Sequence, residues 1–291
     1  MKPILKLGFA DTFGTAEKFF TDVLNRRYTV LINNETPDYL IFGDGNFGQT
    51  HWKYQNCRKI FYTGENVRPS YYTYDHAITF DLEMSPKHYR LPLYVLEMDM
   101  MRWEGVVNDY MWMVNTRPDT DWDQVYGGKR DICTYLQSNP NCQVRNQFMQ
   151  FLMGKKTVDC GGPHLNNIDK VIPRDIHQTI KFLQTGLFNV AFENGSYSGY
   201  TTEKILNCFY ANTIPIYWGN PKVARDFNPK AFINCHDYKS FDDVLSVIEE
   251  LRTDKDKYLD MLSQSAFTNN IPNQYTDLDQ FLDWWDTFVY V

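Results

Sequence analysis

The sequence has no run of apolar residues approaching the roughly 20 that a membrane-spanning helix needs. Its first nine residues hold only a short apolar run before Asp11, so no secretory signal peptide is predicted. Basic residues are also in the minority, and the net charge is −7 at pH 7. Nucleic acid is therefore a poor candidate ligand, although local cations can still hold a small anion. A cytoplasmic protein is favoured, and peripheral attachment to a membrane stays open.

Metal-ligand spacings are missing as well. The six cysteines form no C-x-x-C pair and the six histidines no H-x-x-x-H pair, so neither a zinc site nor a disulfide framework is predicted. The cysteines are expected to be reduced and mostly buried thiols. They are Cys57, Cys133, Cys142, Cys160, Cys208 and Cys235.

The length of 291 residues favours two domains, and 43% hydrophobic with 22% charged residues is ordinary for globular proteins. Apolar runs alternate with amphipathic segments, which indicates α/β domains with mainly parallel sheets. Residues 103–130, with Pro118 and two adjacent glycines, interrupt this alternation and suggest a linker. The predicted domains are 1–128 and 129–275, followed by a helix over 276–291 that could pack back on the first domain.

The expected strands are 5–9, 28–32, 39–42, 59–62, 77–80, 132–136, 157–159, 189–192, 214–218 and 232–235. The expected helices are 16–24, 144–152, 176–183, 202–210, 241–251 and 278–289. Together they predict two doubly wound α/β domains that face each other across a cleft, with ligands at the carboxyl ends of the strands.

The densest cluster of polar residues lies within residues 188–219, which are predicted to form a strand, a Gly/Ser-rich loop, a helix and a strand. Lys204 falls in the first turn of this helix, where the helix dipole disfavours a cation. Its presence there is explained if the helix start binds a phosphate. Glu203 could accept hydrogen bonds from ribose hydroxyls. The alternative interpretation is an exposed Glu-Lys pair on the surface.

The same stretch resembles the donor-binding motif of the α-1,3-fucosyltransferases. It carries Phe192-Glu193-Asn194, then Tyr200-Thr201-Thr202-Glu203-Lys204, and then TIPIYWG over residues 213–219. Two further segments are similar to the family: Ser138-Asn139-Pro140 followed by Arg145 and Phe148, and FYTGENVRPSYYTYDHAITFD over residues 61–81. The resemblance covers roughly residues 59–98 and 130–262.

This resemblance implies a GT-B-like fold and an inverting transfer of L-fucose from GDP-β-L-fucose to a glycan hydroxyl, by default O3 of N-acetylglucosamine. It implies that Glu65 is the general base and that Arg145 and Lys204 clamp the pyrophosphate. Asn194, Tyr200 and Glu203 would contact the nucleotide, its ribose or the fucose. No metal is required under this reading, and stimulation by Mn²⁺ stays open. A glycan on the sequon at Asn194 would block such a site, which again favours a location outside the secretory pathway.

Other patterns allow other functions. Gly43-Asp44-Gly45-Asn46-Phe47-Gly48 matches the G-x-G-x-x-G of dinucleotide sites, which leaves an NAD-dependent oxidoreductase as an alternative. Asp119-Thr120-Asp121-Trp122-Asp123 resembles a D-x-D metal motif, although it follows a proline in an expected loop. A transferase of another GDP-sugar and a sugar-binding protein without activity are further alternatives.

Overall fold

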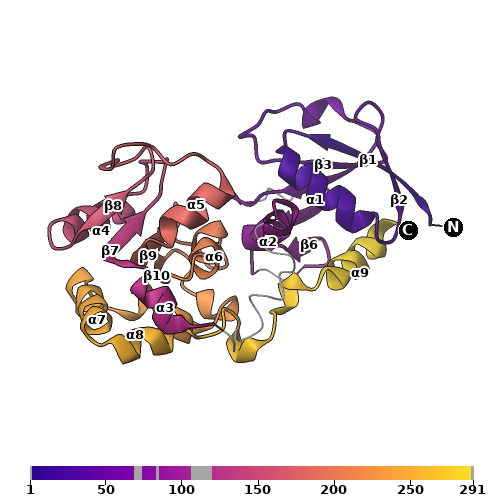
Figure 1. The fold of residues 1–291 in the computed structure, drawn as a ribbon. Coiled ribbons are helices and arrows are strands. Elements are labelled where there is room, and N and C mark those ends of the chain that lie inside the picture. The colour runs from indigo at the N-terminus through magenta and orange to yellow at the C-terminus, as the bar shows by residue number, and fades with distance from the viewer. Residues whose placement is uncertain (1, 69–73, 83–84, 106–119, 290–291) are drawn as a thin grey trace. The chain divides into compact units, whose positions relative to one another are not determined.

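The computed structural model describes residues 2–68, 74–82, 85–105 and 120–289 (Figure 1). The chain divides into two compact units. The first comprises Met1–Met100 and Gln274–Val291, and the second comprises Met101–Asn273. Each unit is built around one sheet. All strand ladders within the described residues are parallel, apart from an isolated antiparallel bridge between Ser85 and His88.

The sheet of the first unit has the strand order β2-β1-β3-β4-β5-β6. Its strands are β1 (Ile4–Ala10), β2 (Thr29–Ile32), β3 (Tyr39–Phe42), β4 (Arg58–Tyr62), β5 (His76–Thr79) and β6 (His88–Arg90). Its helices are α1 (Gly14–Leu24), α2 (Leu93–Trp103, which reaches into the second unit) and α9 (Leu278–Val289), with the short 3₁₀ helices η1 (His51–Lys53) and η7 (Gln274–Thr276).

The C-terminal helix α9 contributes to the core of the first unit, although it is distant in sequence (Figure 1). Phe20 of α1 packs edge-on against Tyr62 of β4, with ring centroids 4.9 Å apart, and lies 6.0 Å from Phe281 of α9. Arg27 pairs with Asp286 of α9 at 2.7 Å. The opposite face of the sheet is covered by the segment after β3, because the His51 ring of η1 stacks on Phe42 with centroids 4.4 Å apart.

The sheet of the second unit has the strand order β11-β10-β9-β7-β8. Its strands are β7 (Arg130–Tyr135), β8 (Val158–Cys160), β9 (Gly186–Phe192), β10 (Ile214–Trp218) and β11 (Ile233–Asn234). Its helices are α3 (Trp122–Gly127), α4 (Gln143–Met153), α5 (Ile176–Leu183), α6 (Glu203–Tyr210), α7 (Phe241–Thr253) and α8 (Lys255–Leu262). The 3₁₀ helices are η3 (Val223–Arg225), η4 (Pro229–Ala231), η5 (Cys235–Asp237) and η6 (Thr268–Asn270).

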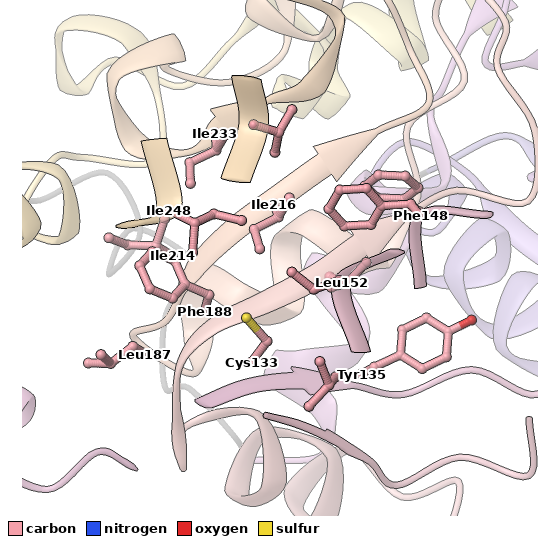
Figure 2. Packing of buried hydrophobic residues seen from close by; sticks show 14 of the residues in the cluster. Cys133, Tyr135, Phe148, Leu152, Leu187, Phe188, Ile214, Ile216, Ile233 and Ile248 are labelled. Carbon is pink, nitrogen blue, oxygen red and sulfur yellow. The ribbon is translucent and has the colours of Figure 1, made fainter. Parts of the chain in front are cut away.

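Helices cover both faces of this second sheet. Apolar side chains of α4, α7 and α8 pack with those of the strands into one large core, where Phe148 and Ile248 flank Ile214 and Ile216 (Figure 2). A smaller cluster on α5, containing Phe182 and Leu183, packs with Ala211 at the end of α6. The second unit is therefore doubly wound, which fixes its loops at the two ends of the parallel strands.

The predicted α/β class with parallel sheets is confirmed, and each predicted strand and helix corresponds to an element of the structure. Among the described strands and α-helices, β6, α2, α3 and α8 were not predicted. Of these, α3 lies within the expected linker 103–130, and residues 106–119 of that segment lie outside the described residues. In the part of the chain that the structure describes, no helix is long and apolar enough to cross a membrane. All six cysteines are free thiols, and four of them are buried.

Candidate active site

The second sheet has a topological switch point between β7 and β9. From β7 the chain continues to β8 on one side, and from β9 it continues to β10 and β11 on the other. Loops after the two central strands therefore leave in opposite directions at the carboxyl edge, which is where doubly wound sheets bind their ligands. The residues after β7 include Gln137 and Asn139, and those after β9 are Glu193 and Asn194.

Arg145 of α4 reaches this edge and is fully buried. Its Nη1 donates to Asn194 Oδ1 at 2.8 Å and to Gln137 Oε1 at 3.2 Å, and Nη2 donates to the Asn139 carbonyl. Within the described residues these partners are neutral, no carboxylate lies within ion-pair distance of Arg145, and its buried Nε–H has no partner. A buried guanidinium without a protein counter-ion favours an anionic ligand.

The start of α6 places a second cation at the same edge. The Lys204 side chain is 12% exposed, and its Nζ lies 3.0 Å from Glu193 Oε2 and 3.3 Å from Glu203 Oε1. Thr202, the residue before the helix, makes no side-chain cap to the first turn. The first N–H groups of α6 and the Lys204 ammonium thus present positive charge in one place.

Glu193 is the buried partner of this helix start. Its side chain is fully buried, Oε1 accepts from the Thr202 N–H at 2.8 Å, and Oε2 accepts from the Thr202 hydroxyl at 2.6 Å. Gly219 allows this packing, because a Cβ there would lie 2.3 Å from Glu193 Cγ. Burial is the main reason that the pKa of Glu193 lies above its ordinary value, although Lys204 lowers it.

Glu203 behaves in the opposite way. Its side chain is 32% exposed. Burial raises the pKa of Glu203, but the Lys204 ammonium and the hydrogen bonds at the helix start outweigh that effect and leave the pKa below its ordinary value. Glu203 is therefore held in its ionised form and can accept hydrogen bonds.

A buried polar network holds the loop between β9 and α6. Asn220 accepts from the Gly199 N–H at 2.7 Å and donates to Thr201 Oγ1 at 3.0 Å and to Asp226 Oδ2 at 3.1 Å. The Tyr200 side chain is fully buried, and the Tyr200 backbone carbonyl accepts a hydrogen bond from the Tyr217 hydroxyl at 3.4 Å. These buried hydrogen bonds hold the loop in place, so Asn194 and the start of α6 are already oriented before a ligand binds.

Glu65 lies in the first unit, in the exposed turn after β4. Its backbone N–H donates to Thr63 Oγ1 at 3.0 Å, and the Thr63 hydroxyl donates to Asp44 Oδ2 at 2.7 Å. The loop after β3 is therefore tied to the turn after β4, and both loops leave the carboxyl edge of the first sheet. The neighbouring residues 69–73 lie outside the described residues.

The glycine motif at residues 43–48 does not lead into an α-helix. A Cβ on Gly43 would lie 2.0 Å from the Asp11 carbonyl oxygen, and the Asp11 carboxylate accepts from the backbone of Thr50 and His51. Only the three-residue η1 follows. The turn therefore lacks the helix N-terminus that binds pyrophosphate in dinucleotide sites. Gly43 serves a close backbone contact instead, and Gly45 and Gly48 adopt positive φ.

The acidic segment 119–123 is also a local structural feature where it is described. Asp121 caps α3 by accepting from the Gln124 N–H at 2.9 Å, and Asp123 pairs with Lys255 at 2.5 Å, while Asp119 lies outside the described residues. Across the described ranges, no group of three or more His, Cys, Asp or Glu side chains is placed to hold a metal ion.

Five of the six predicted site residues, all except Glu65, belong to the second unit. Four of them are in direct contact as two pairs: Arg145 with Asn194 and Lys204 with Glu203. Sequence reasoning assigned no role to Glu193. Its position directly after an apolar strand was the available signal, because a charged residue there lies at the carboxyl edge of the sheet.

The five strands of the second sheet follow the same order as the first five strands of the first sheet, and two such α/β units are typical of a GT-B-like fold. Two protein-family sequence models match this chain. The family model of the α-(1,3)-fucosyltransferase FucT N-terminal domain matches residues 5–97, and the family model of the glycosyltransferase family 10 (fucosyltransferase) C-terminal region matches residues 127–276. The chain therefore belongs to glycosyltransferase family 10, which confirms the family resemblance seen in the sequence.

The α-(1,3)-fucosyltransferase FucT of Helicobacter pylori is 34% identical over 295 residues, which cover 90% of this chain and 60% of that protein. A crystal structure of an α1,3-fucosyltransferase with GDP is 30% identical, covers 100% of this chain and 91% of the other, and has a TM-score of 0.79. A crystal structure of an α1,3-fucosyltransferase with GDP-fucose is 30% identical, covers 99% of this chain and 90% of the other, and has a TM-score of 0.77. These matches confirm the GT-B-like fold.

Proposed function

We propose that this protein is an inverting fucosyltransferase that moves L-fucose from GDP-β-L-fucose to a glycan hydroxyl and forms an α-linkage. The observation that carries the proposal is the buried Arg145 guanidinium, whose described partners are all neutral, at the carboxyl edge where Lys204 also lies. Two fixed cations suit a diphosphate, and the family relationship supports a GDP-sugar as its source.

The chemistry assigns one role to each cation and one to a base. A sugar hydroxyl is a weak nucleophile, so Glu65 accepts its proton as the new bond forms. Negative charge grows on the GDP leaving group, and Arg145 and Lys204 stabilise that charge without rearranging. One in-line displacement with a single base converts the β-linked donor into an α-linked product.

The other site residues hold the donor. Glu203, partly exposed and ionised, accepts hydrogen bonds from ribose hydroxyls, and Asn194 lies at the same edge of the sheet through its bond to Arg145. Tyr200 belongs to the loop between β9 and α6 and its side chain is buried, so it contributes to the donor site by holding that loop in place. The second unit would bind the donor and the first unit the acceptor, with O3 of N-acetylglucosamine as the default position. The location would be cytoplasmic, with peripheral membrane attachment open.

A transfer assay tests this function. The chain is incubated with N-acetyllactosamine and either GDP-fucose or GDP-mannose, and the product is measured by mass spectrometry. We expect a fucosylated product and no mannosylated one. Transfer from GDP-mannose alone would identify a different GDP-sugar transferase, and donor binding without transfer would indicate a sugar-nucleotide-binding protein. Thermal stabilisation by NAD in place of GDP-fucose would support the oxidoreductase.

The reaction is expected to proceed without a divalent metal, because Arg145 and Lys204 supply the positive charge that a metal would otherwise supply. Transfer in excess EDTA should retain most of the rate seen in buffer alone, and added Mn²⁺ should change it only modestly. The same assay with a metal series measures this. A complete loss that Mn²⁺ restores would instead direct attention to the carboxylates of residues 119–123.

A further inference from the structure

The Lys204 ammonium group forms ion pairs with two carboxylates at the start of α6. Lys204 Nζ lies 3.0 Å from Glu193 and 3.3 Å from Glu203. Glu203 is partly exposed and water can solvate it, but the Glu193 side chain is fully buried. The ionised form of Glu193 therefore depends on Lys204 far more than that of Glu203 does.

Within the described parts of the chain, no cation other than Lys204 pairs with the Glu193 carboxylate. Thr202 donates two hydrogen bonds to it, and Tyr217 of β10 is held as a neutral phenol, because burial and the Glu193 charge raise its pKa. Arg145 of α4 donates to the Glu193 backbone carbonyl at 3.4 Å. Among the described residues, Lys204 is the cation paired with the Glu193 side chain.

Binding of a nucleotide-sugar diphosphate adds a third anion to this arrangement. If the donor binds as proposed above, its two phosphate charges share the Lys204 ammonium with Glu193 and also repel the Glu193 charge. A buried carboxylate that loses part of its counter-ion is stabilised by becoming neutral. We propose that Glu193 takes up a proton from solvent when the diphosphate of a sugar nucleotide binds beside Lys204, and so acts as a positioning residue that balances charge in the donor site.

The surroundings of Glu193 already suit the neutral form. Its Oε1 can keep the Thr202 N–H bond, and a protonated Oε2 can donate to the Thr202 hydroxyl oxygen, which also accepts from Lys204 Nζ at 2.9 Å. A glutamine reproduces the two contacts with Thr202, with Oε1 accepting and the amide N–H donating, while its amide nitrogen replaces the oxygen that faces Lys204 Nζ at 3.0 Å. Glu193→Gln is therefore a mimic of the protonated state and is expected to fold.

The sign of the pH dependence follows from linkage. The pKa of Glu193 in the free protein is raised by burial, and the bound diphosphate raises it further. Donor binding is then strongest at pH below the free-state pKa and weakens as pH rises through the interval between the two pKa values, by up to about tenfold for each pH unit. The diphosphate of a sugar nucleotide is a diester and has no proton of its own to exchange near neutral pH.

Titration calorimetry with GDP-fucose, without acceptor, measures the protons exchanged when it is run in buffers of different ionisation enthalpy. We expect net proton uptake by the wild type, an affinity that falls as pH rises through the interval between the free and bound pKa values, and neither effect in Glu193→Gln. At the upper end of this range the variant should bind at least as tightly as the wild type. Glu250→Gln, an exposed substitution in the same unit, should behave as the wild type does.

Two results would overturn the inference while leaving the proposed function intact: GDP-fucose binding to the wild type without proton uptake, and equal uptake by wild type and Glu193→Gln. The first needs no variant and so does not depend on how the variant folds. Failure of the wild type to bind GDP-fucose at all would overturn the proposed function and this inference with it.

Discussion

Glu65→Gln is expected to lower kcat for fucosyl transfer by about 10²- to 10⁴-fold, the effect typical of removing a general base. Glutamine keeps the size of the side chain and its hydrogen-bonding capacity but cannot accept the proton of the attacking hydroxyl. GDP affinity should stay near the wild-type value, because the proposed diphosphate site is built from Arg145 and Lys204 of the second unit whereas Glu65 lies in the first.

Two other accounts of Glu65 predict different outcomes for the same variant. If Glu65 held a nucleotide ribose, GDP affinity would fall and kcat would change less. If its carboxylate supported the turn, Tm would fall, although the hydrogen bonds to Thr63 and Val67 use the Glu65 backbone and survive the substitution. Measuring kcat, GDP affinity and Tm separates the three, with Glu35→Gln on an exposed turn of the same unit as the matched control. A variant that keeps more than about a tenth of kcat would show that another group is the base.

The sequence predicted element boundaries best where buried apolar strands flank a polar loop. The segment around β9, α6 and β10 was predicted to within a few residues at each boundary. Its strands are apolar runs buried on both faces, and Thr202 gives a clear start to the helix. The missed helix α8 shows the opposite case. Its sequence, KDKYLDML, buries only Tyr258 and Leu262, so its apolar signal is weak.

The role of Glu193 could not be predicted from the sequence for a different reason. A glutamate after a strand usually points to solvent, and nothing local indicates that the chain returns so that Thr202 donates two hydrogen bonds to it. The burial of Arg145 likewise depends on a contact with Asn194, 49 positions away. Residue types can indicate which chemistry is available, whereas the pairing of charges depends on how distant segments meet.

Arg145→Ala and Lys204→Ala are each expected to weaken GDP binding by about 10- to 100-fold, because each removes a charge-assisted hydrogen bond worth roughly 1.5–3 kcal/mol to the phosphates. Arg145→Ala should also lower Tm, since the Gln137, Asn139 and Asn194 oxygens lose a buried donor. Lys204→Ala leaves the buried Glu193 without its cation, so Glu193 is expected to be protonated in that variant.

Structural damage and loss of anion binding can be separated in these two variants. Calorimetric GDP affinity is measured well below the Tm of each variant, beside Arg225→Ala and Lys230→Ala, which remove exposed cations of the same unit. The controls should bind GDP as the wild type does, because screened surface charges contribute little to a contact that they do not make. A clamp built from two cations also predicts that raising the salt concentration weakens wild-type binding more than binding by either variant. Unchanged GDP affinity in both Arg145→Ala and Lys204→Ala would show that the diphosphate does not bind at this edge of the second sheet, and the assignment of the second unit as the donor-binding unit would fail with it.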